Sequence, residues 1–134
     1  MFVKFWGVRG SIPTPEHASR IYGGNTSCVE VRTDQGLFIL DAGTGIRRLG
    51  ADLMGRGLSN INVNFLFSHP HWDHIQGFPF FTPAYIPGNT LNVYDVGSEH
   101  KIADLLSGQM SSGYFPVDFK DLGGNVVPQQ LQEG

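Results

Sequence analysis

The four residues Leu37-Phe38-Ile39-Leu40 form an uninterrupted apolar run, and this run restricts the fold more than any other segment. A strand with one solvent-exposed face alternates apolar and polar residues, whereas a continuous apolar run is typical of a strand covered on both faces. Covering both faces requires further layers of structure against the sheet. A second segment, residues 61–67, also reads as a strand and ends abruptly at Ser68.

Further strands are predicted where aromatic and β-branched residues gather between turn signals. The expected ranges are residues 2–8, 27–33, 36–41 and 91–96, with residues 126–127 as an edge strand. The turn Asp34-Gln35-Gly36 favours a hairpin between the second and third of these. Residues 9–25 contain two prolines and three glycines, so we expect a long loop there rather than a linker between domains.

Two helices are predicted from apolar residues at helical spacing. The first follows the turn at residues 41–45, where Ile46, Leu49 and Leu53 make one apolar stripe. The second is expected over residues 99–110, with Ser98 as its N-cap. Strands interleaved with two helices predict an α/β or α+β fold with helices packed on a sheet. The 134 residues suffice for a single domain, 1–134.

Composition excludes several functional classes. The net charge of −3 argues against a generally basic nucleic-acid-binding surface, though not against a small site that recognises phosphate. The one cysteine, Cys28, cannot form an internal disulfide, so a reducing cytoplasm fits best. No secretory signal and no apolar stretch of membrane-spanning length is present, so we expect a cytoplasmic protein without a membrane partner.

The segment after the strand at 61–67 carries the chemistry. Three of the five histidines lie in it, in the pattern His69-x-His71-x-Asp73-His74. His69 and His71, two apart in an extended segment, can point to one side and share a metal ion, while Asp73 and His74 can reach a second. Imidazole and carboxylate suit Zn²⁺, Fe²⁺ or Mn²⁺. The alternative is a polar loop whose histidines only hydrogen-bond the backbone.

This pattern resembles the signature of the metallo-β-lactamase superfamily. Residues 5–13, 22–28, 40–45, 74–81 and 114–117 are similar to the branch with ribonuclease Z-like and cyclic-nucleotide-phosphodiesterase-like enzymes. The resemblance covers residues 2–121. It implies an αββα sandwich, a dinuclear metal site and hydrolysis of phosphodiesters by a metal-bound hydroxide.

The resemblance also implies residue roles. His69 and His71 would bind one metal ion, Asp73 and His74 the other, and Asp73 would be the catalytic residue. Asp41 would support the metal-site loop from behind the ligands, a role worth about 10–100-fold in affinity or activity; an ordinary turn aspartate is the alternative. The metal is expected to be zinc, with manganese or iron as alternatives. Asn25, Thr26 and Ser27 would orient the site or form a polar turn.

The chain departs from the family in its extent. The family takes three further ligands from the second half of its fold, and the only histidine here after His74 is His100, which matches no ligand. We therefore expect the N-terminal half of the αββα sandwich, a mixed sheet with helices on one face. The other face would be apolar and exposed. The sequence would then be a fragment, a homo-oligomer such as a face-to-face dimer, or a chain completed by another.

Two functions follow. The first is a metal-dependent hydrolase acting on a small-molecule or nucleotide phosphodiester; β-lactam, thioester or lactone hydrolysis on the same fold is a variant of it. The second is a metal-binding or self-associating half-domain without efficient catalysis.

Overall fold

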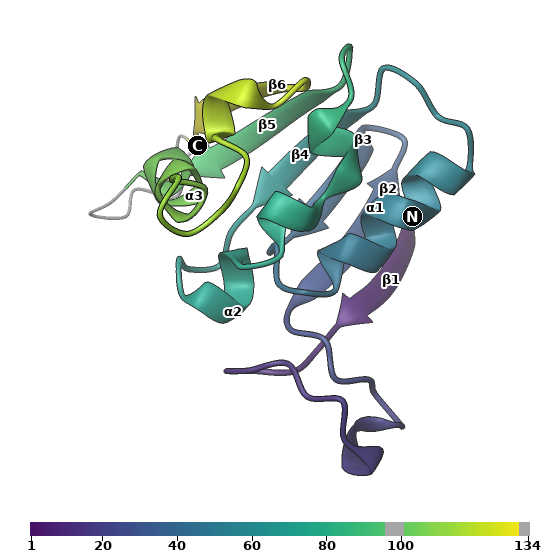
Figure 1. Ribbon diagram of the computed structural model, residues 1–134. Coiled ribbons are helices and arrows are strands. Elements are labelled where there is room, and N and C mark those ends of the chain that lie inside the picture. The colour runs from purple at the N-terminus through teal and green to yellow at the C-terminus, as the bar shows by residue number, and fades with distance from the viewer. Residues whose placement is uncertain (96–100, 132–134) are drawn as a thin grey trace.

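The computed structural model describes residues 1–95 and 101–131, and its centre is a six-stranded β-sheet (Figure 1). The strands are β1 (Phe2–Gly7), β2 (Cys28–Thr33), β3 (Gly36–Leu40), β4 (Asn62–Leu66), β5 (Thr90–Asp95) and β6 (Asn125–Gln130). They lie side by side in the order of the sequence. β1, β2 and β3 are antiparallel, whereas β4, β5 and β6 each run parallel to the strand before them. This is the mixed sheet that the sequence predicts.

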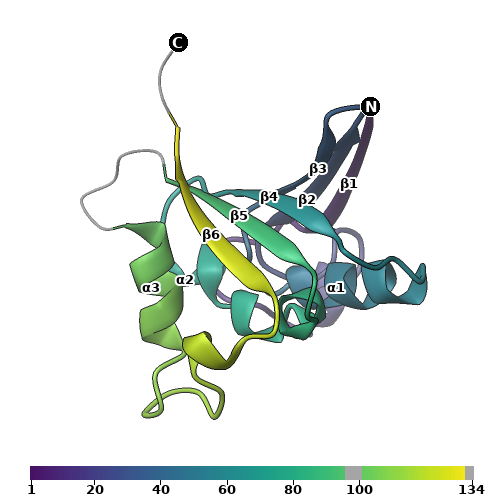
Figure 2. The same ribbon diagram turned by 90° about the horizontal axis from the view of Figure 1, so that it is seen from above.

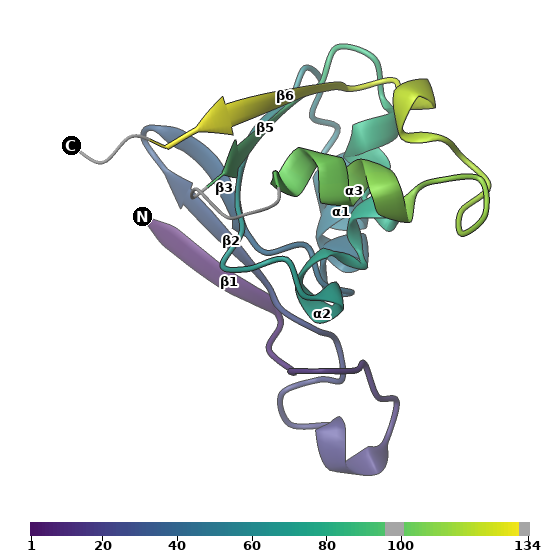
Figure 3. The same cartoon turned by 90° about the vertical axis from the view of Figure 1, so that its left-hand side faces the viewer.

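Three helices cover one face of this sheet. They are α1 (Ile46–Gly55), α2 (Trp72–Ile75) and α3 (Ile102–Gln109), and Figures 2 and 3 show all of them on the same side. α1 forms where the sequence predicts it, and it buries the predicted stripe of Ile46, Leu49 and Leu53. None of the helices in the described ranges is long and apolar enough to cross a membrane.

The core lies between the sheet and the helices. Each strand contributes alternate residues to it, among them Ile39, Val63, Phe65, Leu91 and Val93. Phe65 is the centre, since its ring meets Phe78 and Phe81 edge-on at centroid distances of 5.9 and 5.5 Å. Phe78 begins the 3₁₀ turn η2 (Phe78–Phe80), and Phe81 lies between η2 and the next turn, η3 (Thr82–Tyr85); both turns lie between α2 and β5.

One charged residue, Glu30 of β2, is fully buried on the helix side. Its carboxylate accepts a hydrogen bond from Trp6 Nε1 at 3.0 Å and pairs with Arg32 at 3.1 Å and Arg56 at 3.4 Å. A buried carboxylate is tolerated only with such partners. Glu30 therefore ties β1 and β2 to the end of α1, and it plays no part in the site described below.

The opposite face of the sheet carries no helix (Figures 2 and 3). Because side chains alternate along a strand, the strand pairing places one apolar set on this face. Its members are Val3, Phe5, Val29, Val31, Phe38, Leu40, Leu66, Tyr94 and Val127. Val3, Phe5 and Leu40 are 45%, 67% and 36% exposed. We call this set the open sheet face; it is the exposed apolar surface that the sequence predicts.

The element boundaries differ little from the sequence predictions. The strands end within one or two residues of the expected limits, apart from β6, which extends to Gln130. The last helix begins at Ile102, with Lys101 at its N-cap. The predicted cap Ser98, together with Glu99 and His100, lies outside the described residues. Residues 9–25 form the expected loop, with one 3₁₀ turn at His17–Ser19, and project from the body (Figures 1 and 3).

Candidate metal centre

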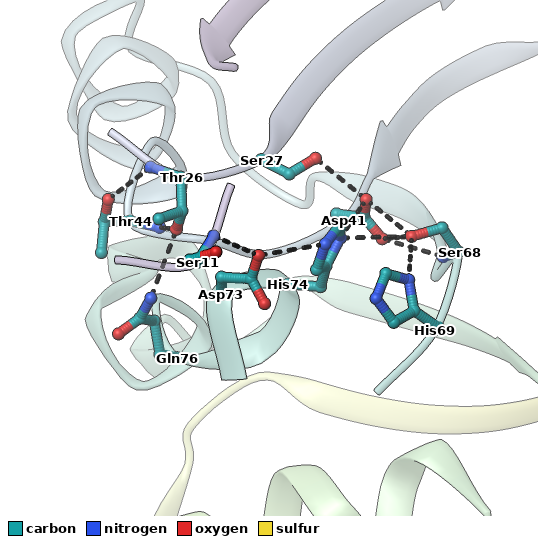
Figure 4. A network of polar contacts seen from close by, with 10 residues as sticks. All are labelled: Ser11, Thr26, Ser27, Asp41, Thr44, Ser68, His69, Asp73, His74 and Gln76. Carbon is teal, nitrogen blue, oxygen red and sulfur yellow. Dashed lines mark hydrogen bonds and ion pairs between the residues drawn. The ribbon is translucent and has the colours of Figure 1, made fainter. Parts of the chain in front are cut away.

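The candidate site lies where the parallel strands β3 and β4 end. Leu40 and Leu66 are paired at their last positions, and the amide of Asp41 donates to the carbonyl of Leu66 at 3.0 Å. Since the carboxyl ends of parallel strands meet at one edge of the sheet, Asp41 and Ser68 become neighbours although 27 residues separate them. The motif occupies the loop and short helix that follow (Figure 4).

Asp41 is the centre of the hydrogen bonds at this edge. Its carboxylate accepts from the Ser68 amide at 2.8 Å, the Ser68 hydroxyl at 2.9 Å and the Ser27 hydroxyl at 2.9 Å. It also lies 2.7 Å from His74 Nδ1. The residue is buried and has a φ of 61°, a left-handed conformation that aspartate tolerates better than most residues. With Nδ1 engaged, the other nitrogen of His74, Nε2, points away from Asp41 (Figure 4).

The structure brings all four predicted ligands together. The ring centroids of His69 and His71 are 4.5 Å apart, and those of His69 and His74 are 4.0 Å apart. Asp73 Oδ2 lies 3.4 Å from His74 Nε2. In residues 1–95 and 101–131, however, no three His, Cys, Asp or Glu side chains stand in an arrangement that could hold a metal ion. The role of these four residues as ligands therefore stays a prediction.

The donor set nevertheless fits a divalent cation in its chemistry. Three imidazoles and a carboxylate are ligands of zinc and similar ions. A ligating histidine typically donates its second ring N–H to a carboxylate, and the contact between His74 and Asp41 has that form. The histidine rings lie against one another, and the hydrogen bonds found for them in the described ranges go to the side chains of Ser68 and Asp41.

The electrostatics at Asp73 favour a cation as well. The amide of Ser11 donates to Asp73 Oδ2 at 2.9 Å, and this bond is the main reason that the pKa of the Asp73 carboxyl lies below its usual value. Burial opposes this effect and is the next largest contribution, while His74 and His69 lower the pKa by smaller amounts. A lowered pKa keeps the carboxylate ionised and able to bind a positive ion.

A group of side-chain hydrogen bonds behind the motif connects three chain segments. The Thr26 amide donates to the Thr44 hydroxyl at 2.9 Å, and the Thr44 amide donates to the Thr26 hydroxyl at 2.8 Å. Asn25 Oδ1 accepts from the Thr44 hydroxyl at 3.1 Å, and Gln76 Nε2 reaches Thr26 at 3.4 Å. Asn25 and Thr26 thus bind the scaffold, whereas Ser27 contacts Asp41 directly.

Two serines of the site are absent from the sequence prediction. Ser68 directly precedes the motif, so its place at the end of a buried strand was a usable signal. Ser11 belongs to a loop 62 residues away, and nothing in its composition indicates contact with Asp73. Other candidates lie elsewhere: Cys28 is fully buried, where burial and the nearby Asp41 and Glu30 raise its thiol pKa, and His17 is exposed on the projecting loop.

Comparisons with known proteins agree with this picture. A sequence model described as the metallo-beta-lactamase superfamily matches residues 21–126. The fold is similar to that of human tRNase Z, short form, with a TM-score of 0.58 and 20% identity over 98% of this chain and 46% of that one. It is also similar to a diphosphatase from the PhnP family, with a TM-score of 0.62 and 19% identity over 97% of this chain and 50% of that one. This chain spans about half the length of either structure. Comparison with curated proteins gave no match.

Proposed function

This chain belongs to the metallo-β-lactamase superfamily, and from that premise we propose that it is the metal-binding αβ half of a phosphodiesterase-type hydrolase. One observation carries the proposal: Asp41 holds His74 at 2.7 Å, with His69 and Asp73 beside it, at the end of two parallel strands. The substrate class would be a small-molecule or nucleotide phosphodiester. The similar folds of a tRNase Z and a diphosphatase support a phosphate ester over the other chemistries of this fold.

In this proposal His69 and His71 would hold one divalent cation, and Asp73 and His74 a second, with zinc as the first candidate and manganese or iron as alternatives. Such a cation supplies charge that polarises a phosphoryl oxygen and acidifies water. In this proposal His74 Nδ1–H donates a hydrogen bond to Asp41, so the lone pair of His74 Nε2 faces the site. The hydrogen bond from Ser11 keeps Asp73 ionised for its role as ligand and catalytic residue. The single buried cysteine, Cys28, supports a cytoplasmic location.

The test is a titration with Zn²⁺ and Mn²⁺, together with an assay on bis(p-nitrophenyl) phosphate. For the isolated chain we expect one cation, with the second bound only in a completed fold, and weak turnover, because the described residues hold no group of three ligands as they stand. A chain that binds no cation would contradict the proposal. Two tightly bound cations with full turnover would contradict the idea of a half site. Binding without any turnover would favour the second function, a metal-binding half-domain.

We also propose that the open sheet face packs against the same face of a second copy. Its strand positions carry no charged side chain within the described strands, so two copies would not repel each other. On the same side of β4 and β5, next to this apolar set, Asn92 Nδ2 donates to the side-chain oxygens of Asn62 and Asn64 at 2.8 and 3.1 Å. Asn62 Nδ2 and Asn92 Oδ1 have no partner among the described residues. Asn62 Nδ2 is a donor and Asn92 Oδ1 an acceptor. Across a two-fold axis, the donor of one copy can therefore pair with the acceptor of the other.

Self-association follows as a measurable result. Light scattering should give twice the mass of one chain, since an apolar face of this kind is rarely left exposed. Val31→Lys, in β2 on this face, should give a folded monomer because it would bury two like charges. Ala51→Lys, on the exposed side of α1, is the matched control and should remain a dimer. A monomeric unaltered chain would contradict the proposal and leave a different, completing chain as the partner.

A further inference from the structure

The loop between β1 and β2 contacts the candidate metal centre through a backbone amide. The amide nitrogen of Ser11 lies 2.9 Å from Asp73 Oδ2, and Figure 4 shows this contact beside the pair formed by Asp73 and His74. Both described contacts of the Asp73 carboxylate with other residues, Ser11 and His74, use Oδ2. No other residue in the described ranges donates a hydrogen bond to Oδ1. The Ser11 bond thus fixes the carboxylate through one oxygen and leaves the other available.

Ser11 makes this bond from an unusual backbone conformation. Its φ is 72°, a left-handed value that costs an L-residue roughly 1–2 kcal/mol. Among the described residues, three other than glycine have a positive φ: Ser11, Asp41 and Asn60. Two of these three contact motif side chains, Ser11 through its amide and Asp41 through its carboxylate. Strained backbone persists where the surroundings impose it, and it gathers at functional sites.

The surroundings of Ser11 are firmly held. The amides of Val8 and Arg9 donate to the carbonyl of Asn25 at 3.1 and 3.0 Å, which closes the base of the loop. Arg9 Nε donates to the carbonyl of Ile12 at 2.9 Å, and the Ile12 amide donates to the carbonyl of Gly10 at 3.0 Å. These bonds form a tight turn on both sides of Ser11, which directs its N–H at Asp73.

We propose that Ser11 is a positioning residue of the metal centre, which orients the Asp73 carboxylate through its backbone amide and not through its side chain. The inference rests on the proposed metal binding. Because the amide acts, the hydroxyl of Ser11 is dispensable and the left-handed turn is the requirement. Glycine adopts that conformation freely, whereas proline has a fixed negative φ and no N–H.

The test compares three variants of Ser11 in a titration with Co²⁺, followed by its visible absorption. Ser11→Ala and Ser11→Gly retain the amide and should bind Co²⁺ with the affinity and spectrum of the unaltered chain. Ser11→Pro should bind about 10–100-fold more weakly, the usual effect of losing a group that orients a ligand, and should show an altered spectrum. Gly10→Ala, whose new Cβ would meet nothing within 4 Å, is the control for a change in the same turn.

A second measurement covers the case in which Ser11→Pro disturbs the fold. In ¹⁵N-labelled protein, Asp73→Ala should move the Ser11 amide resonance and speed its hydrogen exchange, while the Gly10 amide stays unchanged. An unaffected Ser11 amide would overturn the inference, as would Ser11→Pro with undiminished Co²⁺ affinity, and the proposed function would survive both results. If the unaltered chain binds no Co²⁺, Zn²⁺ or Mn²⁺, the proposed function fails and this inference fails with it.

Discussion

Replacing both His69 and His71 by alanine is expected to abolish cation binding and to leave the fold intact. Both side chains are exposed and belong to a loop, so they contribute no core packing. Even groups that only orient a ligand are worth about 10–100-fold in affinity, so removing two ligands should cost more than about 100-fold. Metal titration gives the affinity, and circular dichroism of the metal-free proteins compares the folds.

His17→Ala is the matched control for this double variant. His17 is an exposed imidazole on the projecting loop, and it should bind no cation of the site. If the double variant unfolds without metal while His17→Ala does not, His69 and His71 are structural residues. Undiminished cation affinity in the double variant would place the metal elsewhere.

Gly43→Ala is expected to destabilise the fold more than any surface substitution near the site. A Cβ at Gly43 would lie 2.4 Å from the carbonyl oxygen of Asp73, 2.4 Å from the Thr26 hydroxyl and 2.7 Å from the carbonyl oxygen of Ser27. Two of these neighbours are backbone atoms and cannot rotate away. Overpacking of side chains costs about 1–3 kcal/mol, and we expect about 3 kcal/mol or more here. Urea unfolding gives the free energy of unfolding directly.

The control substitution is expected to change the free energy of unfolding in the opposite direction. Gly55 is the last residue of α1, and a Cβ there would meet nothing within 4 Å. Gly55→Ala should stabilise the protein by about 0.5–1 kcal/mol, because alanine favours the helix. If Gly43→Ala were as stable as the unaltered chain, the close approach of the three segments at the metal centre would be wrong.

Patterning predicted most of the fold because each element satisfies a local rule. The apolar run at Leu37–Leu40 forms a strand within the sheet, although helices cover only one of the two faces that the run predicted to be covered (Figure 2), and the stripe on α1 faces the core. The inward position of Glu30 is a feature that such local rules do not predict. Its inward position depends on Trp6, Arg32 and Arg56, which come from other elements, and no pattern within β2 indicates them.

The candidate site likewise has one part that the sequence predicts and one part that it does not. The ligand candidates are contiguous in sequence, so their spacing alone predicted the cluster that His69, His71, Asp73 and His74 form. Ser11 acts through a backbone amide, which every residue except proline possesses, so its identity carries no signal. Only the path of the loop brings that amide to Asp73. Contacts of this kind depend on tertiary structure and are not predictable from residue types.

The order of the strands has a consequence for how the chain assembles during synthesis. Each strand pairs with the strand that precedes it in sequence, from β1 to β6. A chain that emerges N-terminus first therefore never has to keep a strand unpaired until a distant partner is made. Pairing between strands that are adjacent in sequence shortens the loops that must close. Shorter loops speed folding and reduce the time for which unpaired strand edges are exposed. The hairpin of β2 and β3 closes the shortest loop, so we expect it to form first, and each later strand can join an existing edge of the sheet as it emerges.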